Sequence, residues 1–323
     1  MDRPTFRTEL QIPGSPVKIG LKDVVVTMGS CFSDVIGGYL QSHKFDATAN
    51  PFGTVYNPIS IFNLLSSKVW EEDKFVESNG LFYHYDAHSS FLATSKDELA
   101  GKLQRVKDEV DEKLQKANWL VITFGTSLVY KMKSTGDVVA NCHKVPQKHF
   151  SKHALSMKEL TEGFDSFYQA IKRSNPSLKL LLTVSPVRHI KDGLVDNSSS
   201  KSKLRVLCDM CSDAYDGVYY FPSYEIMLDD LRDYRFYKAD MIHPNDVAEE
   251  YIWDKFQQVY FDQDTQNFVR QWEKIKLAIN HKPFSRESPA HQRFLTSTLA
   301  ALEKFRGIVD ISEEEKILKE QMI

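Results

Sequence analysis

Continuous apolar runs alternate with amphipathic segments along the first 260 residues. Runs rich in β-branched and aliphatic residues, typical of strands buried on both faces, occupy 24–26, 119–124, 178–184 and 218–221. Between them, apolar residues recur at helical spacing, most clearly over 96–117 and near 156–173. This alternation predicts a parallel sheet covered by helices on both faces, with a functional site at the carboxyl ends of the strands.

The first apolar run ends in a sharp turn. Val24–Val26 leads to Gly29, and a helical pattern starts at once with Phe32, Val35 and Ile36 on one face. Glycine permits a tight backbone there, and the free N–H groups and dipole of the following helix favour negative charge. A nucleophilic side chain in this turn would have its oxyanion stabilised by the backbone.

Other stretches are given coarser assignments. We expect a rigid loop over 46–60, because of its prolines, asparagines and glycine, and a polar loop over 192–202. We expect a hairpin that pairs 81–86 with 91–94, and two short β-like pieces after residue 127, followed by a polar loop up to residue 153. Beyond Asn245 the pattern is helical, and we divide the chain into an α/β/α domain over 1–261 and a helical extension over 262–323 that packs on it.

Composition and charge limit the partners. The 323 residues are 42% hydrophobic and 26% charged, with a net charge of −3, so nucleic acid and anionic membranes are not attracted in general. The start of the chain lacks the apolar core of a secretion signal, and no apolar run is long enough to span a bilayer. The four cysteines do not suggest a disulfide scaffold. We expect a cytoplasmic protein with a small-molecule or carbohydrate-like partner.

Asp240 and His243 form the second focus of the sequence. An Asp three residues before a His, in a turn closed by Pro244 before a helix, lets the carboxylate reach one imidazole nitrogen while the other faces outward. The carboxylate would then select the tautomer and support an imidazolium. The alternative is a helix entry in which Asp240 caps nearby N–H groups and His243 is a surface residue.

These two blocks carry a family resemblance. Gly29–Asp34 resembles the Gly-Asp-Ser-Leu-Ser-Asp block of the SGNH/GDSL hydrolases, and Asp240–Asn245 resembles their C-terminal Asp-x-x-His block. Gly29–Phe32 carries the signature of the GSCFA family within that superfamily, although Ser33 stands where the signature has Ala. The resemblance covers about 20–260. It implies a three-layer α/β/α sandwich with a flavodoxin-like parallel sheet, an Asp-His pair and oxyanion donors from loops, and it requires no metal or cofactor.

The resemblance leaves two candidate nucleophiles. Aligned on Gly29, Cys31 stands where the superfamily has its Ser, and Ser30 stands where it has Asp. A thiol at a helix N-terminus beside a histidine has its pKa lowered from about 8.5, so we favour Cys31, whereas Ser30 would need His243 as base. The alternative is that Cys31 is a small buried hydrophobe and Ser30 a helix cap.

The remaining candidates surround this centre. By resemblance, Gly53 is the oxyanion glycine, and Gly125 and Ser127 lie where a Gly-x-Asn segment is expected, with Ser127 shorter than the usual Asn. The residues expected to bind substrate are Asn50, Tyr56, His143, Arg188, His189 and Arg235. For the arginines, ion pairing with Asp229, Asp230 or Asp233 is the competing assignment. Cys208-x-x-Cys211 is assigned to a buried helix face rather than to a metal or redox site.

The predicted function is acyl-ester hydrolysis by an SGNH-type esterase. Cys31 or Ser30 attacks the acyl carbonyl, His243 moves the proton and Asp240 orients it. By resemblance, the substrate is an O-acylated carbohydrate or a similar small metabolite. Two rivals stay open at this point, an acyltransferase that passes the acyl group to a sugar hydroxyl and a non-catalytic module that binds a ligand in the same cleft.

Overall fold

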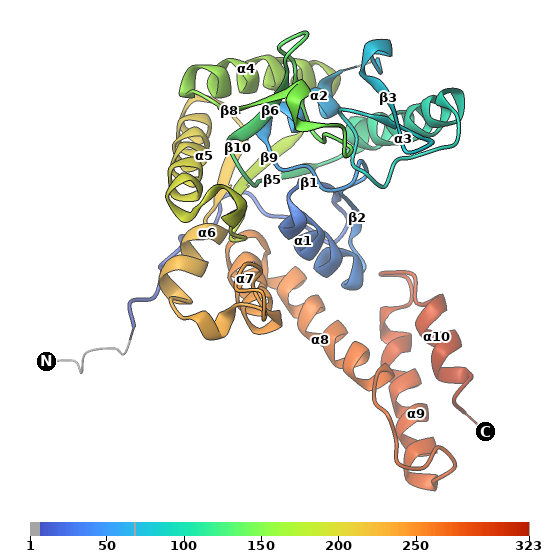
Figure 1. The fold of residues 1–323 in the computed structure, drawn as a ribbon. Helices are drawn as coiled ribbons and strands as arrows, with labels where there is room; N and C mark the ends of the chain where they lie inside the picture. Colours follow the sequence, from blue (N-terminus) through green and yellow to red (C-terminus); the bar gives the residue numbers. More distant parts are fainter. Residues whose placement is uncertain (1–6, 68, 323) are drawn as a thin grey trace, which may run out of the picture.

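A five-stranded parallel sheet forms the centre of the protein. The computed structural model describes residues 7–67 and 69–322. The sheet has the order β10-β9-β5-β1-β2, and all its neighbours are parallel (Figure 1). Its strands are β1 (Val24–Gly29), β2 (Asp46–Ala49), β5 (Trp119–Phe124), β9 (Lys179–Val184) and β10 (Val218–Phe221). Along the chain, β2 is added on one side of β1, and β5, β9 and β10 are added on the other. The strand order therefore reverses beside β1, and ligands bind at such a position in open α/β sheets.

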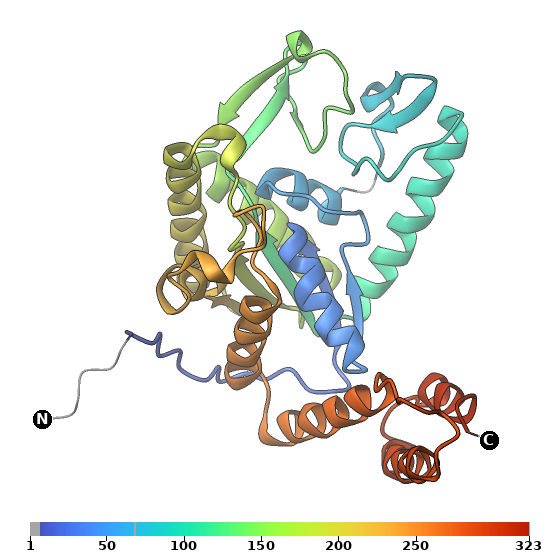
Figure 2. The ribbon, with the colours of Figure 1, turned by 60° about the horizontal axis from the view of Figure 1, so that its bottom comes forward.

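Helices cover both faces of this sheet, as expected. Its strands present successive residues to opposite faces, so Val25 joins one hydrophobic cluster and Val26 the other. The helices on the Val25 face are α1 (Cys31–Ser42) and α7 (Asp246–Tyr260). Those on the Val26 face are α2 (Pro58–Ser66), α3 (Lys96–Lys116), α4 (Met157–Ser174) and α5 (Leu194–Ala214). Figure 2 shows α1 lying across the sheet. The predicted α/β/α sandwich is confirmed.

Capping side chains explain where several helices begin. Ser95 accepts from the N–H of Glu98 at the start of α3, and Asn245 accepts from Ala248 at the start of α7. At α4, Ser156 and Glu159 form a reciprocal capping box.

A helix and short turns follow β10, namely α6 (Ser223–Glu225), η4 (Ile226–Asp230) and η5 (Tyr234–Phe236). The chain therefore reaches Asp240 through irregular structure rather than directly from a strand.

Several sequence assignments are wrong in detail. Part of the predicted loop over 46–60 is the edge strand β2, whose short polar sequence has no apolar run and is recognised only by its pairing with β1. Most of the predicted loop over 192–202 belongs to α5, which begins directly after Gly193. Serine and asparagine disfavour helix interiors, but here the buried Asn197 and Ser200 accept the N–H groups of His189 and Ser127.

Two small antiparallel sheets were also only partly predicted. The hairpin joins β3 (Phe75–Ser78) to β4 (Leu81–His84), and the expected partner 91–94 makes a single bridge, between Phe82 and Ala93. The polar end of the 127–153 segment is a strand, so a three-stranded sheet forms from β6 (Leu128–Met132), β7 (Val138–Val139) and β8 (Phe150–Ala154). Short strands at these edges are defined by their partners and not by a hydrophobic period.

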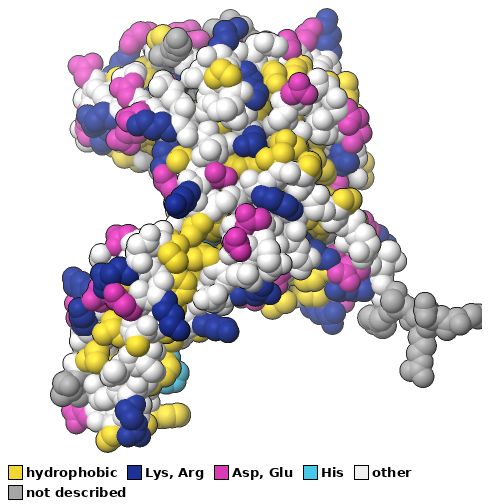
Figure 3. Space-filling view, turned by 180° about the vertical axis from the view of Figure 1, so that it is seen from behind, with side chains coloured by type: hydrophobic (Ala, Val, Ile, Leu, Met, Phe, Trp, Pro, Cys, Tyr) yellow, Lys and Arg dark blue, Asp and Glu magenta, His cyan; other side chains and the backbone are white. Residues whose placement is uncertain are grey.

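The C-terminal residues form a helical extension, as expected. Its helices are α8 (Gln263–Ile279), α9 (Pro289–Leu302) and α10 (Ser312–Lys319). They project from the α/β part as an arm (Figures 1 and 3). The end of α1 holds the arm, because the Trp272 indole N–H donates to the Ser42 carbonyl at 3.0 Å and the buried His43 lies 2.8 Å from a Glu273 oxygen. In the described part of the chain, no helix is both long and apolar enough to cross a bilayer.

Candidate active site

The turn between β1 and α1 is built by close backbone contacts. Gly29 has φ of +139°, and a Cβ placed on it would lie 2.1 Å from the Thr123 carbonyl oxygen, so no other residue fits without displacing β5. Its N–H donates to Asn50 Oδ1 at 2.8 Å, and the Ser30 N–H donates to the Thr123 carbonyl at 3.0 Å. The neighbouring strands therefore determine where Ser30 and Cys31 lie.

Ser30 and Cys31 face different surroundings. Ser30 is completely buried at the N-cap of α1, and its Oγ makes no hydrogen bond with any described residue. Cys31, the first residue of α1, is half-buried and lines an open cleft at the carboxyl edge of the sheet. The structure thus brings the thiol, and not the hydroxyl, to the cleft.

Asp240 and His243 pair as the sequence suggested. Asp240 Oδ2 lies 2.7 Å from His243 Nδ1, while Asp240 Oδ1 accepts the N–H groups of Ile242 and His243 at 2.8 and 3.0 Å. These bonds hold the pKa of Asp240 down, at about 2. The carboxylate therefore performs both of the roles considered above, capping the turn and orienting the imidazole. Nδ1 is occupied, so Nε2 is the nitrogen left for chemistry.

One cleft of about 450 Å³ contains Cys31 and His243. Its other polar side chains include Tyr56, Thr126, Arg188 and His189. No hydrogen bond joins Cys31 directly to His243 among the described residues. The Tyr56 and His189 rings meet edge to face with centroids 5.3 Å apart, and the guanidinium of Arg188 stacks on Tyr237 at 4.2 Å. A cleft of this size suits a small substrate.

The pKa of Cys31 moves in the direction opposite to our expectation. Burial raises it, and the neighbouring Asp34 carboxylate raises it further. The N–H groups of Cys31 and Phe32 and the Lys201 ammonium act the other way, but they offset only part of this increase. The helix N-terminus alone therefore does not activate this thiol, and the sequence-based prediction of a lowered pKa is wrong.

The expected oxyanion donors are engaged elsewhere. The Gly53 N–H donates to the Asn50 carbonyl at 2.7 Å, and Gly53 does not line the cleft. The Gly125 N–H donates to the Tyr56 carbonyl, and the buried Ser127 donates through both N–H and Oγ to Ser200 Oγ. In this conformation the N–H groups of Cys31 and Phe32 are the backbone donors at the Cys31 sulfur.

Three of the predicted substrate-binding residues lie in the cleft and three do not. Tyr56, Arg188 and His189 line it. Asn50 is buried and holds the Gly29 turn. His143 is buried against Tyr83, with Nε2 2.8 Å from the His84 carbonyl, and Arg235 lines a separate pocket beside Phe236.

The arginines also differ in their partners. Arg232, three residues before Arg235, forms an ion pair with Asp229. Arg188 stacks on tyrosines and forms no ion pair among the described residues. Of the arginines singled out from the sequence, Arg188 is therefore the one whose charge faces the cleft.

Sequence reasoning missed Lys201 and Thr126. Thr126 lines the cleft, and its Oγ lies 3.1 Å from Ser200 Oγ. Lys201 is 1% exposed, and its Nζ donates to the Ser185 carbonyl at 2.7 Å. It lay in the stretch assigned to a polar loop, so the predicted structure gave no reason to place it in the interior. A helical assignment over 194–214 would have placed Asn197, Ser200 and Lys201 on one face.

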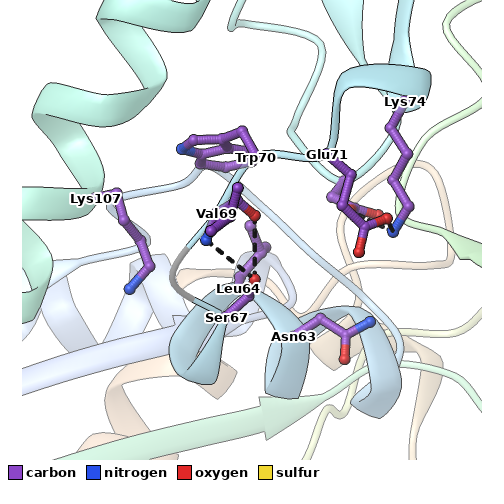
Figure 4. Close-up of a pocket in the computed structure, with 9 residues that line it drawn as sticks. Asn63, Leu64, Ser67, Val69, Trp70, Glu71, Lys74 and Lys107 are labelled. Carbon is purple, nitrogen blue, oxygen red and sulfur yellow. Dashed lines mark hydrogen bonds and ion pairs between the residues drawn. The ribbon is translucent and has the colours of Figure 1, made fainter.

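A second cavity, of about 150 Å³, lies apart from this cleft and shares none of its residues. It is enclosed by α2, Trp70 and Lys107, and Lys74 there pairs with Asp86 and Glu71 at 2.9 and 3.0 Å (Figure 4). Its charged groups are paired, and it contains no nucleophile beside a base.

Cys208 and Cys211 are buried and free, and no group of described residues could hold a metal ion.

The fold and the cleft define an α/β/α protein with a Cys, His and Asp constellation at the carboxyl edge of a parallel sheet. The model of the GSCFA family matches residues 24–256, so the chain belongs to the GSCFA family. The model described as "GSCFA domain protein, C-terminal domain" matches residues 272–323. The division at residue 261 remains a prediction.

Solved structures resemble the chain only weakly. One is a carbohydrate esterase family 3 protein from Talaromyces cellulolyticus, with 8% identity and a TM-score of 0.35, which covers 78% of this chain and 99% of its own. Another has 13% identity and a TM-score of 0.37, and covers 73% of this chain and 94% of its own. No curated protein matches the chain.

Proposed function

We propose that this protein is an acyl-ester hydrolase of the SGNH type, with Cys31 as nucleophile, His243 as general base and acid, and Asp240 as the residue that orients His243. The observation that carries the proposal is that Cys31 and an Asp-bound His243 line one cleft at the carboxyl edge of the sheet. Ligands bind at that edge in open α/β sheets. The resemblance of both blocks to the SGNH/GDSL hydrolases supports the same assignment.

The first half of the reaction acylates Cys31. The thiol proton passes to His243 Nε2, and Sγ forms a bond to the acyl carbonyl carbon. The resulting oxyanion accepts hydrogen bonds from the N–H groups of Cys31 and Phe32, which have no partner within the first turn of a helix. The alkoxide leaves as the C–O bond breaks and takes the proton from Nε2. No hydrogen bond joins Cys31 Sγ to His243 before substrate binds. The two side chains therefore come together in the enzyme–substrate complex.

The second half restores the thiol. His243 takes a proton from water, the hydroxide attacks the thioester carbonyl, and the carboxylic acid leaves as Sγ is reprotonated. Asp240 stays ionised throughout, because its low pKa keeps it a carboxylate at neutral pH. The substrate is an O-acylated carbohydrate or a similar small metabolite, in keeping with the cleft volume of about 450 Å³.

Trapping with an activated ester tests the nucleophile. The parent protein, Cys31→Ala, Ser30→Ala and Cys142→Ala are mixed with an aryl acetate and analysed by intact mass. We expect an acetyl adduct on the parent, on Ser30→Ala and on Cys142→Ala, and none on Cys31→Ala. Cys142 is the matched control, because it is also a half-buried free cysteine but lies outside the cleft. Acylation of Cys31→Ala at the parental rate would overturn the assignment.

Product analysis separates hydrolysis from transfer. With an acyl thioester and added sugars, a hydrolase releases the free acid at a rate that is independent of the sugar. An acyltransferase would instead form the sugar ester with little free acid. A folded protein that neither acylates nor turns over any activated ester, but retains a sugar ester in the cleft, would favour a binding module.

A further inference from the structure

Thr126 is a largely buried residue that lines the same cleft as the proposed nucleophile. It is 9% exposed, and the cleft is also lined by Cys31 and His243. Thr126 follows β5 by two residues, just as Cys31 follows β1 by two residues. These strands are neighbours in the sheet, and their register pairs Gly29 with Thr123. Thr126 and Cys31 therefore leave adjacent parallel strands at the same edge of the sheet.

Two consecutive loop residues tie the turn after β1 to the turn after β5. The Val55 N–H donates to the Gly29 carbonyl at 2.9 Å. The Tyr56 carbonyl accepts the N–H groups of Gly125 and Thr126 at 2.8 and 3.0 Å. These bonds hold the two turns beside each other, and they engage the backbone N–H of Thr126. Only the side chain of Thr126 can therefore offer a donor to the cleft.

The hydrogen bonds around Ser200 leave the Thr126 hydroxyl proton free. A hydroxyl oxygen accepts two hydrogen bonds and donates one. Ser200 Oγ accepts from the N–H and from the Oγ of Ser127, at 2.7 and 3.2 Å, so both of its acceptor positions are filled. Ser200 therefore donates its own proton to Thr126 Oγ1, 3.1 Å away. Thr126 Oγ1 also accepts the Leu128 N–H at 3.1 Å. The Thr126 proton then has no acceptor among the described residues.

We propose that Thr126 is a catalytic residue whose hydroxyl donates a hydrogen bond to the oxyanion of the tetrahedral intermediate. The donors expected at Gly53 and Ser127 are engaged elsewhere. The network that engages Ser127 holds Thr126 Oγ1 through two accepted bonds, so this donor is preorganised. Thr126 keeps its proton throughout, and the bonds that form and break are those of the proposed reaction. The role rests on the proposed function, because the oxyanion forms only when Cys31 is acylated.

Acylation and alkylation of Cys31, measured side by side by peptide mass, test the proposal. Acylation by an aryl acetate passes through an oxyanion, whereas alkylation by iodoacetamide displaces iodide and develops no charge on a carbonyl oxygen. We expect Thr126→Val, which removes the hydroxyl and keeps the shape, to slow acetylation of Cys31 about 10²-fold. Alkylation should keep the parental rate. In steady-state hydrolysis, kcat and kcat/KM should fall equally, because the bond is made only in the transition state.

Two control variants separate the hydroxyl from packing. Thr126→Ser loses only the methyl group and keeps the donor, so it should retain most of the parental acylation rate. Thr183 is the matched control outside the cleft, because it is also buried near the end of a strand and bonded to a serine, Ser223, at 2.7 Å. Thr183→Val should lower the Tm through the unsatisfied partner, and the folded protein should acylate Cys31 at the parental rate.

Several outcomes would overturn the proposal. An equal loss of acylation in Thr126→Ser and Thr126→Val would do so, and a parallel loss of alkylation in Thr126→Val would indicate a displaced thiol instead of a missing donor. If Thr126→Val does not fold, Thr126→Ala takes its place with the same expectations. A parent that forms no acyl adduct on Cys31 contradicts the proposed function and this role with it. An adduct that forms equally fast on the parent and on folded Thr126→Val contradicts this inference alone.

Discussion

The two halves of the candidate site are built in opposite ways. In the Gly29–Cys31 turn the first two residues are buried and Cys31 is half-buried, and its hydrogen bonds run to Thr123 and Asn50, far away in the sequence. In the Asp240–His243 loop the two named side chains are exposed, 43% and 42% accessible, and the bonds of the Asp240 carboxylate join residues two or three apart. The nucleophile is therefore positioned by the fold, whereas the base is oriented by its own short segment.

This difference separates stability from activity. A change in the turn disturbs the packing of β1, β5 and the 50–57 loop, so it acts on folding first. A change in the Asp240–His243 loop removes exposed side chains that support little else, so it acts on chemistry. Burial also makes Cys31 harder to ionise. The packing that fixes the thiol in place removes it from water, and this desolvation raises its pKa.

The largest expected effect follows from a methyl group at Gly29. Gly29→Ala places Cβ 2.1 Å from the Thr123 oxygen in a left-handed backbone, so we expect a loss of more than about 4 kcal/mol in the free energy of unfolding. Gly80→Ala is the control, since Gly80 has φ of +74° but no atom within 4 Å of the added Cβ, and should cost about 1 kcal/mol. Urea unfolding measures both. If Gly29→Ala and Gly80→Ala lose the same free energy of unfolding, the close contact of the Gly29 turn with β5 does not constrain the fold.

Removing the imidazole should have a large effect on activity alone. We expect His243→Ala to reduce kcat/KM for an aryl acetate by about 10²–10⁴, while the free energy of unfolding changes by less than about 0.5 kcal/mol. His153→Ala is the matched control, because His153 is similarly exposed and pairs with Glu159 outside the cleft. Hydrolysis by His243→Ala at the parental rate would exclude His243 as the base.

The smallest expected effect is on the stability of the folded protein at acid pH. The pKa of His189 is lowered to about 4 in the folded protein, against an ordinary value near 6.5, so below pH 6.5 the unfolded chain binds a proton that the folded chain does not. Stability therefore falls as the pH drops from 6.5 towards 4, by about 1–2 kcal/mol between pH 7 and pH 5 from this residue.

Urea unfolding at pH 7 and pH 5 measures this contribution. The proteins compared are the parent, His189→Gln and His243→Gln. We expect the loss at pH 5 to be smaller in His189→Gln than in the parent. Buried His84 behaves in the same way and remains in all three proteins, so its contribution cancels in the comparison. An identical loss in His189→Gln and the parent would mean that His189 is not held neutral by burial.

The sequence by itself determined the features that depend on near neighbours. Four of the five strands of the central sheet, the turn at Gly29 and the pairing of Asp240 with His243 follow from apolar runs, a glycine and a spacing of three residues. These signals are local, because strand periodicity, turn conformation and a short side-chain reach are properties of a few consecutive residues.

Only the tertiary structure decided which groups share the cleft and how they are charged. β2 is a strand because β1 offers it partners, and the Gly125 N–H is engaged because the Tyr56 carbonyl lies beside it. Lys201 is buried beside the end of β9, in a stretch that was predicted as a polar loop, and Cys31 is harder to ionise because of the atoms that bury it. Hydrogen-bond partners and desolvation come from residues distant in the chain, so no local pattern encodes them.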